Sequence, residues 1–280
     1  GSETIPALLF FFIIFLIPES PRWLIVHGEG AKASSVLQKI YLSPDEASRQ
    51  KSITEDSIKG EVKTERKALL SPGILKAVLI GSAIAILGQF MGVNAVLYYG
   101  PEIFKEAGLS SGDALFSQVL VGFVNMGTTV IALLIIDKVG RKNLVYWGVS
   151  GMILSLLMIG FYFIFPEQLG SIFMLVFFLF YVFCCAISIC AVVFVLLSEM
   201  YPNNVRGIAM SIAGLALWIG TYLIGQLTPW LLANVPPFAP AGTFFLFALM
   251  CVPYLLIMWK LVPETTGKTL EEIERYWKER

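Results

Sequence analysis

The sequence predicts an all-α membrane protein, and three observations support this fold class. Hydrophobic residues make up 57% of the 280-residue chain, a share typical of membrane proteins. Several apolar stretches reach the roughly 20 residues that an α-helix needs to cross a bilayer. Charged residues gather between these stretches and at their ends. This pattern indicates membrane-spanning helices joined by polar segments.

The chain divides into four predicted parts. Residues 1–18 form a partial membrane helix, because the apolar stretch 5–17 is short for a full span. Residues 19–72 form a charged helical insert, residues 73–262 a six-helix transmembrane bundle, and residues 263–280 a tail. Gly1 and Ser2 could be a cloning remnant, so the chain could begin where a longer protein was cut. No removable signal peptide is expected, since a basic region and a cleavage site are missing.

The six full spans and two helices of the insert follow from apolar length and periodicity. The spans are expected at about residues 73–99, 114–136, 144–165, 171–197, 208–232 and 243–262. Within the insert, residues 31–41 and 45–67 suit amphipathic helices, separated by a break at Ser43-Pro44-Asp45.

The basic residues predict the orientation of the chain in a cell membrane. If the insert is cytoplasmic, most of the other basic residues near span ends fall on the same side, and only Lys105 falls on the opposite side. Those on the cytoplasmic side are Lys138, Arg141, Lys142, Arg206, Lys268, Arg275, Lys278 and Arg280. We therefore expect a multi-pass protein with residue 1 outside and residue 280 in the cytoplasm.

The apolar stretch 84–101 is interrupted by polar residues and glycines. Gln89 and Asn94 are costly in hydrocarbon, so their amides should face protein or a wet cavity. The neighbouring Gly88 and Gly92 allow the helix to bend or unwind there, which membranes tolerate where the backbone lines a cavity. The stretch is therefore a candidate wall of a binding site. Alternatively, Gln89 pairs across a helix interface and never contacts a ligand.

Helix geometry adds a condition to this interpretation. In a straight helix, Gln89 and Asn94 point about 140 degrees apart, whereas Asn94 and Tyr98 share a face. If Gln89 and Asn94 address one ligand, the helix must be unwound near Gly92.

Charged residues also cluster at four helix ends on the predicted cytoplasmic side. Carboxylates and guanidinium groups at one membrane face can form partly buried pairs that hold helix ends together until a conformational change separates them. Any single member could instead be a solvated anchor or a topology signal. The candidate gate residues are Glu19, Arg22, Asp137, Arg141, Glu199, Arg206 and Glu264.

Other classes of function find little support. The 20 basic and 20 acidic residues balance, so nothing points to a nucleic-acid partner. The four cysteines lack zinc-site spacing and are interpreted as small buried hydrophobic residues, and His27 has no second ligand type nearby. No nucleophile with a base, no paired acids at catalytic spacing and no nucleotide loop can be found. We expect no enzyme activity, no cofactor and no metal.

The charged motifs together resemble the signatures of the sugar porter family within the major facilitator superfamily. They read Pro-Glu-Ser-Pro-Arg-Trp at 18–23, Asp-x-x-Gly-Arg-Lys at 137–142, Glu-x-Tyr-Pro-x-x-x-Arg-Gly at 199–207 and Pro-Glu-Thr-x-Gly-Lys-Thr at 263–269. The stretch 84–101 is similar to that family's Gln-Gln-x-x-Gly-Ile-Asn-x-x-x-Tyr-Tyr motif in the seventh transmembrane helix. Bacterial proton:xylose symporters and facilitative glucose transporters are the relatives that this resemblance suggests.

The resemblance implies a parent of twelve helices in two six-helix bundles. This chain would hold the sixth helix, an intracellular helical domain as the insert, and helices seven to twelve. It would thus be the C-terminal half of a monosaccharide transporter that takes a hexose or pentose and works by alternating access. Such a half forms one wall of the sugar site and is not expected to transport alone.

Sugar contacts implied by the family map onto this chain in part. The matching residues are Gln89, Asn94, Tyr98, Asn125 and Trp218. Asn125 could equally belong to an interhelical polar patch with nearby threonines, and Trp218 could be a packing residue. The sequence departs from the family motifs at Gly88, Ala191, Phe194 and Leu217. These departures remove expected hydrogen bonds and a Gly-Pro hinge.

Glu3 resembles a glutamate at the start of the sixth helix in proton-coupled members of the family. In those members the glutamate contributes to proton coupling. It could instead be an exposed residue near the chain terminus. Expected partners are a monosaccharide, the bilayer, and either the missing N-terminal half or a second copy of the chain. The alternative function is a non-transporting orphan, sensor or engineered scaffold that keeps the fold and has lost the sugar site.

Overall fold

The computed structural model describes residues 4–41, 43–59, 69, 71–202, 205–235, 240–268 and 270–278. Every regular element among these residues is a helix, which confirms the predicted all-α class. The chain falls into two compact units, Gly1–Thr64 and Glu65–Arg280.

The described part of the first unit contains four helices: α1 (Thr4–Ile14), α2 (Pro21–Val26), α3 (Gly30–Ile40) and α4 (Pro44–Lys59). The last three pack on one another and bury Leu24, Leu37 and Ala47. α2 was not predicted, although its start carries a clear signal: Ser20 Oγ accepts a hydrogen bond from Trp23 N at 3.2 Å. The two predicted insert helices match α3 and α4, while residues 60–67 lie outside the described part.

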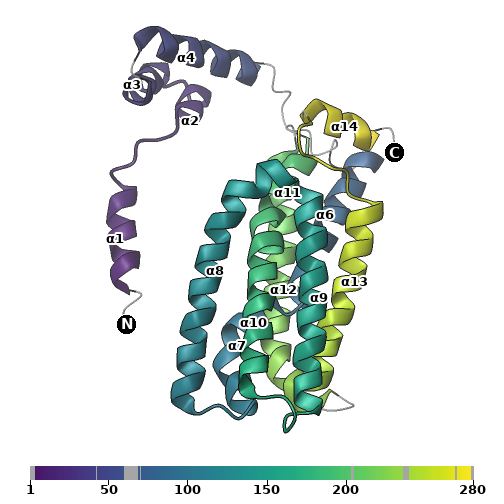
Figure 1. The fold of residues 1–280 in the computed structure, drawn as a ribbon. Coiled ribbons are helices and arrows are strands. Elements are labelled where there is room, and N and C mark those ends of the chain that lie inside the picture. The colour runs from purple at the N-terminus through teal and green to yellow at the C-terminus, as the bar shows by residue number, and fades with distance from the viewer. Residues whose placement is uncertain are drawn as a thin grey trace. The chain divides into compact units, whose positions relative to one another are not determined.

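The second unit is a helical bundle (Figure 1). Its elements are α6 (Pro72–Phe90), α7 (Val93–Glu106), α8 (Ser111–Val139), α9 (Arg141–Ile164), α10 (Ser171–Cys185), the π-helix η1 (Ala186–Cys190), α11 (Ala191–Met200), α12 (Arg206–Asn234), α13 (Ala241–Lys260) and α14 (Leu270–Lys278). Among the described residues, six helical segments are long and apolar enough to cross a membrane, as the sequence predicted. Two of these segments are composite, because α6 continues into α7 and α10 continues through η1 into α11.

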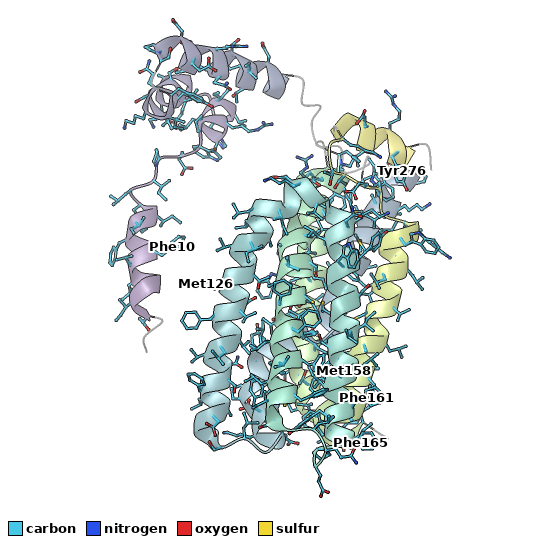
Figure 2. All side chains as sticks on the ribbon, in the orientation of Figure 1. Phe10, Met126, Met158, Phe161, Phe165 and Tyr276 are labelled. Atoms are coloured by element: carbon cyan, nitrogen blue, oxygen red, sulfur yellow. The ribbon has the colours of Figure 1, made fainter. Side chains whose placement is uncertain are left out.

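The bundle exposes apolar side chains on its outer face. Met126 on α8 and Phe161 on α9 are among the side chains that project away from the helices in Figure 2, and they are 61% and 44% exposed. Inside, Phe104 and Phe178 are fully buried with ring centroids 4.5 Å apart. An apolar exterior around a packed core suits a bilayer, where lipid covers the outer face.

The α6–α7 segment breaks at Gly92, where the sequence predicted unwinding. Gly92 has φ +88°, a left-handed conformation that favours glycine. The break leaves the Met91 carbonyl outside the regular helix pattern, and the Tyr181 hydroxyl of α10 donates a hydrogen bond to it at 2.8 Å. A helix break at this depth is thus compensated by a side chain from a neighbouring helix.

A second interruption of α7 arises at Pro101. Proline has no N–H, so the carbonyl four residues earlier, on Leu97, loses its helical donor. Gln118 of α8 supplies one instead, because its Nε2 donates to the Leu97 oxygen at 2.9 Å. In α12, Pro229 leaves Gly225 in the same position, and the Tyr99 hydroxyl donates to that carbonyl at 2.9 Å.

Replacing Gly92 with alanine should lower the free energy of unfolding by about 2 kcal/mol, since a left-handed non-glycine residue costs roughly 1–2 kcal/mol. The added Cβ would also lie 2.5 Å from Phe247 Cδ2. Gly88→Ala is the matched control, because its Cβ would meet Ile189 at 3.6 Å and Tyr254 at 3.7 Å, which are ordinary contacts. Thermal unfolding in detergent checks both variants. Equal midpoints for the two would contradict the role of the left-handed conformation.

Gln118→Leu should lower the free energy of unfolding by about 2 kcal/mol, because the partly buried Leu97 carbonyl then loses its donor. The comparison variant is Gln168→Leu, at an exposed position after α9, which should stay near wild type. The thermal midpoint in detergent measures both effects. If Gln118→Leu unfolds at the wild-type temperature, the Leu97 carbonyl does not depend on that amide.

Candidate binding cleft and charged helix ends

A cleft of about 270 Å³ opens among α6, α7, η1, α11 and α12. Four of the five predicted sugar contacts line it, namely Gln89, Asn94, Tyr98 and Trp218. Its other lining residues are Val93, Leu97, Ile189, Cys190, Val193, Phe194, Leu217 and Thr221. A mostly apolar surface with a few polar groups is typical of small-molecule sites.

The polar centre of the cleft is a pair of amides on either side of the Gly92 break. Asn94 Nδ2 donates to Gln89 Oε1 at 2.7 Å. Thr221 Oγ1 of α12 lies 3.2 Å from the same oxygen and 3.0 Å from the Leu217 carbonyl, so its one proton is shared between these two acceptors. Gln89 therefore lines the cleft and also pairs across a helix interface. Its contact with a ligand stays a prediction.

The amide pair keeps hydrogen-bonding capacity on its open side. Among the described residues, the Gln89 amide nitrogen and the Asn94 amide oxygen make no hydrogen bond. One is a donor and the other an acceptor. A hydroxyl can accept from the first and donate to the second, so the pair suits a ligand rich in hydroxyl groups.

Three aromatic side chains flank the amides. Tyr98 lies one turn after Asn94, Phe194 comes from α11 and Trp218 from α12. They are 59%, 50% and 67% exposed, so their rings are open to the cleft or its surroundings. Such rings can pack against the apolar face of a ligand.

Asn125 is separated from the other predicted contacts. It borders a much smaller cavity of about 10 Å³, together with Tyr181 and Cys185. That cavity shares Val93, Leu97 and Cys190 with the main cleft. The structure thus places Asn125 behind the cleft wall rather than on its surface.

Sequence reasoning missed Thr221 and misjudged Cys190. Thr221 lies three residues after Trp218 on α12 and so shares its face, a spacing that could have identified it. The interpretation of all four cysteines as buried hydrophobic residues is wrong for Cys190, which is exposed. The reason is the π-helical turn, which no residue in its sequence signals and which turns Cys190 toward the cleft.

At one end of the bundle, Arg141 joins two helices. It is the first residue of α9, follows Gly140 at φ +91°, and is only 8% exposed. Its Nη2 lies 2.8 Å from Asp137 Oδ1 of α8 and 2.7 Å from Glu199 Oε1 of α11. This end of the bundle, with Asp137, Arg141 and Glu199, is called the charged end below.

The segment after α13 completes the charged end. Thr265 Oγ1 donates to Glu199 Oε2 at 2.5 Å, and Thr266 Oγ1 donates to Glu264 Oε1 at 2.8 Å. The backbone N–H of Arg141 also donates to Thr266 Oγ1, at 3.3 Å. Glu264 is therefore tied to the network through the Thr266 hydroxyl, a residue that was not among the predicted gate residues.

The remaining candidate charges lie elsewhere. Arg206 donates from Nε and Nη2 to the Tyr201 carbonyl, both at 3.3 Å, and so secures the turn before α12. Burial raises the pKa of the Tyr201 phenol well above its ordinary value. Glu19 and Arg22 belong to the first unit. Glu19 lies two residues before α2, and Arg22 lies in its first turn. Glu3 lies outside the described residues.

A bundle of membrane-length helices with a polar-centred cleft and charge-paired helix ends defines a multi-pass helical membrane protein. The family profile described as "Sugar (and other) transporter" matches residues 1–277. The chain belongs to this sugar transporter family, the sugar porters of the major facilitator superfamily.

Known relatives agree with the family assignment. The chain is 38% identical to the D-xylose-proton symporter of Escherichia coli K12, over 99% of this chain and 56% of that protein. It is 37% identical to the arabinose-proton symporter of Bacillus subtilis, over 98% of this chain and 58% of that protein. These relatives are transport proteins, not enzymes.

Solved structures show the same relation. The proton:xylose symporter XylE bound to 6-bromo-6-deoxy-D-glucose aligns with a TM-score of 0.79 at 38% identity, over 99% of this chain and 58% of that chain. An inward-open XylE structure from E. coli aligns with a TM-score of 0.77 at 35% identity, over 99% and 55%. The chain therefore spans little more than half the length of the relatives it matches.

Proposed function

We propose that this chain is the C-terminal half of a monosaccharide transporter and that its cleft forms one wall of a hexose or pentose site. The observation that carries the proposal is the Gln89–Asn94 pair on the cleft wall, which keeps one amide donor and one amide acceptor without a hydrogen-bond partner among the described residues. Adjacent hydroxyls of a pyranose ring match such a pair. Relatives named for xylose and arabinose transport support the same class of ligand.

The aromatic residues complement the amides in this proposal. A sugar ring presents hydroxyls at its edge and C–H groups on its faces. Trp218 and Tyr98 offer apolar surface to the faces while Gln89 and Asn94 address the edge. The affinity is expected to be weak, because Leu217 and Phe194 line the cleft where the family resemblance calls for other side chains.

The charged end is proposed to face the cytoplasm and to act as a gate. The excess of basic residues on that side supports this orientation. Arg141 bridges α8 and α11, and Thr265 adds a third segment, so the network holds three helix ends of this bundle together at the proposed gate. Access would change sides as this bundle rocks against another one.

The chain alone is proposed to bind sugar without carrying it across the membrane. One bundle supplies only one wall of a pathway, so transport requires either an N-terminal half or a second copy of the chain. Proton coupling through Glu3 remains a further proposal, which a Glu3→Gln variant of an active assembly would test by loss of proton uptake with sugar.

Calorimetric titration of the detergent-solubilised chain with D-xylose and D-glucose tests the sugar site. Saturable heat with either sugar supports it, and no heat at high millimolar concentration overturns it. Saturable sugar flux into liposomes that contain this chain alone would instead overturn the half-transporter part.

A non-transporting membrane protein is the second candidate. The apolar side chains of Leu217 and Phe194 in the cleft favour it, because they supply no hydrogen bonds to a sugar. A well-folded chain without sugar binding in the titration would select this candidate.

A further inference from the structure

The π-helical turn η1 brings two cysteine thiols into contact. In an α-helix, residues five apart point about 140 degrees away from each other. A π-helix bonds residue i to residue i+5 and therefore stacks such residues on one side. Cys185 directly precedes the turn and Cys190 is its last residue. Their sulfur atoms lie 3.4 Å apart.

One member of the pair is reachable from the cleft and the other is shielded. Cys190 is exposed and lines both the main cleft and the small cavity behind it. Cys185 is buried and borders only the small cavity. An accessible thiol backed by a second thiol is the arrangement in which a sulfenic acid is captured as a disulfide.

The other two cysteines are held in different surroundings. Cys184 is buried beside Gly151 of α9. Cys251 is buried on α13, and its sulfur donates to the Phe247 carbonyl at 3.4 Å. Neither has a sulfur–sulfur contact, so they provide controls within the same chain.

We propose that Cys185 and Cys190 form an oxidisable dithiol, converted to a disulfide across the π-helical turn by a hydroperoxide that enters the cleft. The Cys190 thiolate attacks one peroxide oxygen, the O–O bond breaks, and a sulfenic acid and water form once the leaving oxygen is protonated. The Cys185 thiol then attacks the sulfenic sulfur, the S–O bond breaks and a second water leaves. Two thiols lose two electrons and two protons in total, and one hydrogen peroxide becomes two waters.

The two sulfur atoms start close to bonding distance. A disulfide brings its sulfur atoms to about 2.05 Å, so the pair must approach by somewhat more than 1 Å from its present 3.4 Å. The product would link the residue before the turn to its last residue and hold the turn closed. Protection by sugar rests on the proposed function: a sugar bound in the cleft covers Cys190 and slows the reaction.

Peptide mapping of the full chain in detergent tests the thiol pair. After treatment with hydrogen peroxide and alkylation of the remaining thiols, the wild type should lose two of its four free thiols and yield a Cys185–Cys190 cross-link that a reductant reverses. Cys185→Ser and Cys190→Ser should abolish the cross-link, whereas the matched control Cys184→Ser should keep it. Four free thiols after oxidation, or a cross-link from Cys185 to Cys251, would overturn the proposal.

Maleimide labelling of Cys190 separates this inference from the proposed function. With D-xylose at ten times its dissociation constant, about one site in eleven stays empty, so labelling should slow about tenfold. If the cross-link forms but xylose does not slow the labelling of Cys190, the sugar site is contradicted and the dithiol is supported. If xylose slows the labelling but no cross-link forms, the dithiol is contradicted and the sugar site is supported.

Discussion

Arg141→Ala should lower the free energy of unfolding of the bundle by about 3 kcal/mol, the low end of the range for breaking a buried ion pair. The arginine side chain is 10% exposed and that of Glu199 is 25% exposed. Removing the guanidinium therefore leaves a partly buried carboxylate whose remaining partner is the Thr265 hydroxyl. The fall in thermal midpoint in detergent measures the loss.

Asp137→Asn is the matched control for Arg141→Ala. Asp137 lies 2.8 Å from Arg141 and Glu199 lies 2.7 Å from it, but the Asp137 side chain is 79% exposed. An exposed ion pair contributes about 0–1 kcal/mol. We expect Asp137→Asn to unfold near the wild-type temperature. The thermal midpoint of Glu199→Gln should lie between those of Asp137→Asn and Arg141→Ala. Equal effects for Asp137→Asn and Arg141→Ala would contradict the role of burial.

Asn94→Ala should weaken D-xylose binding about ten- to hundredfold, equivalent to about 1.4–2.8 kcal/mol. The substitution removes the acceptor on the open side of the amide pair and also the donor that holds Gln89 Oε1. Gln89 then keeps only the Thr221 hydroxyl as a partner and is free to turn. Calorimetric titration of the variant measures the change in affinity.

Asn234→Ala provides the matched control for the amide experiment. Asn234 is the last residue of α12, is exposed, and donates to the Trp230 carbonyl at 2.9 Å. It carries the same amide away from the cleft, so its loss should leave the affinity unchanged. If both asparagine variants bind xylose like the wild type, the amide pair is not part of a sugar site.

The helices could be predicted because a bilayer demands long apolar segments with internally bonded backbone. The structure extends most spans beyond the predicted apolar limits, as at α8 from 114–136 to Ser111–Val139. Helices continue beyond the hydrocarbon core of the membrane, where their residues are polar and the hydrophobicity of the sequence no longer indicates a span. The break at Gly92 was predictable because two costly amides five residues apart require it if they share a site.

Tertiary partners could not be predicted in the same way. Thr221, Thr265 and Thr266 are ordinary hydroxyl residues whose roles depend on which helix lies opposite. Arg206 belongs to a charged motif, yet its guanidinium bonds a nearby backbone carbonyl instead of a carboxylate. The same local sequence permits either partner, and only packing decides between them.

The π-helical turn also sets a rotational phase between the two ends of one membrane segment. A π-helical turn acts as one extra residue in an α-helix, and each residue turns the helix by about 100 degrees. Before the turn, the segment presents Cys185 to the bundle. After the turn, α11 presents Phe194 to the cleft and Glu199 to Arg141. Deleting one residue within Ala186–Cys190 would rotate α11 as a unit, so cleft and ion pair would lose their alignment in the same step. The positions of the cleft wall and of the charged end are therefore coupled, because both depend on the rotation of the same helix.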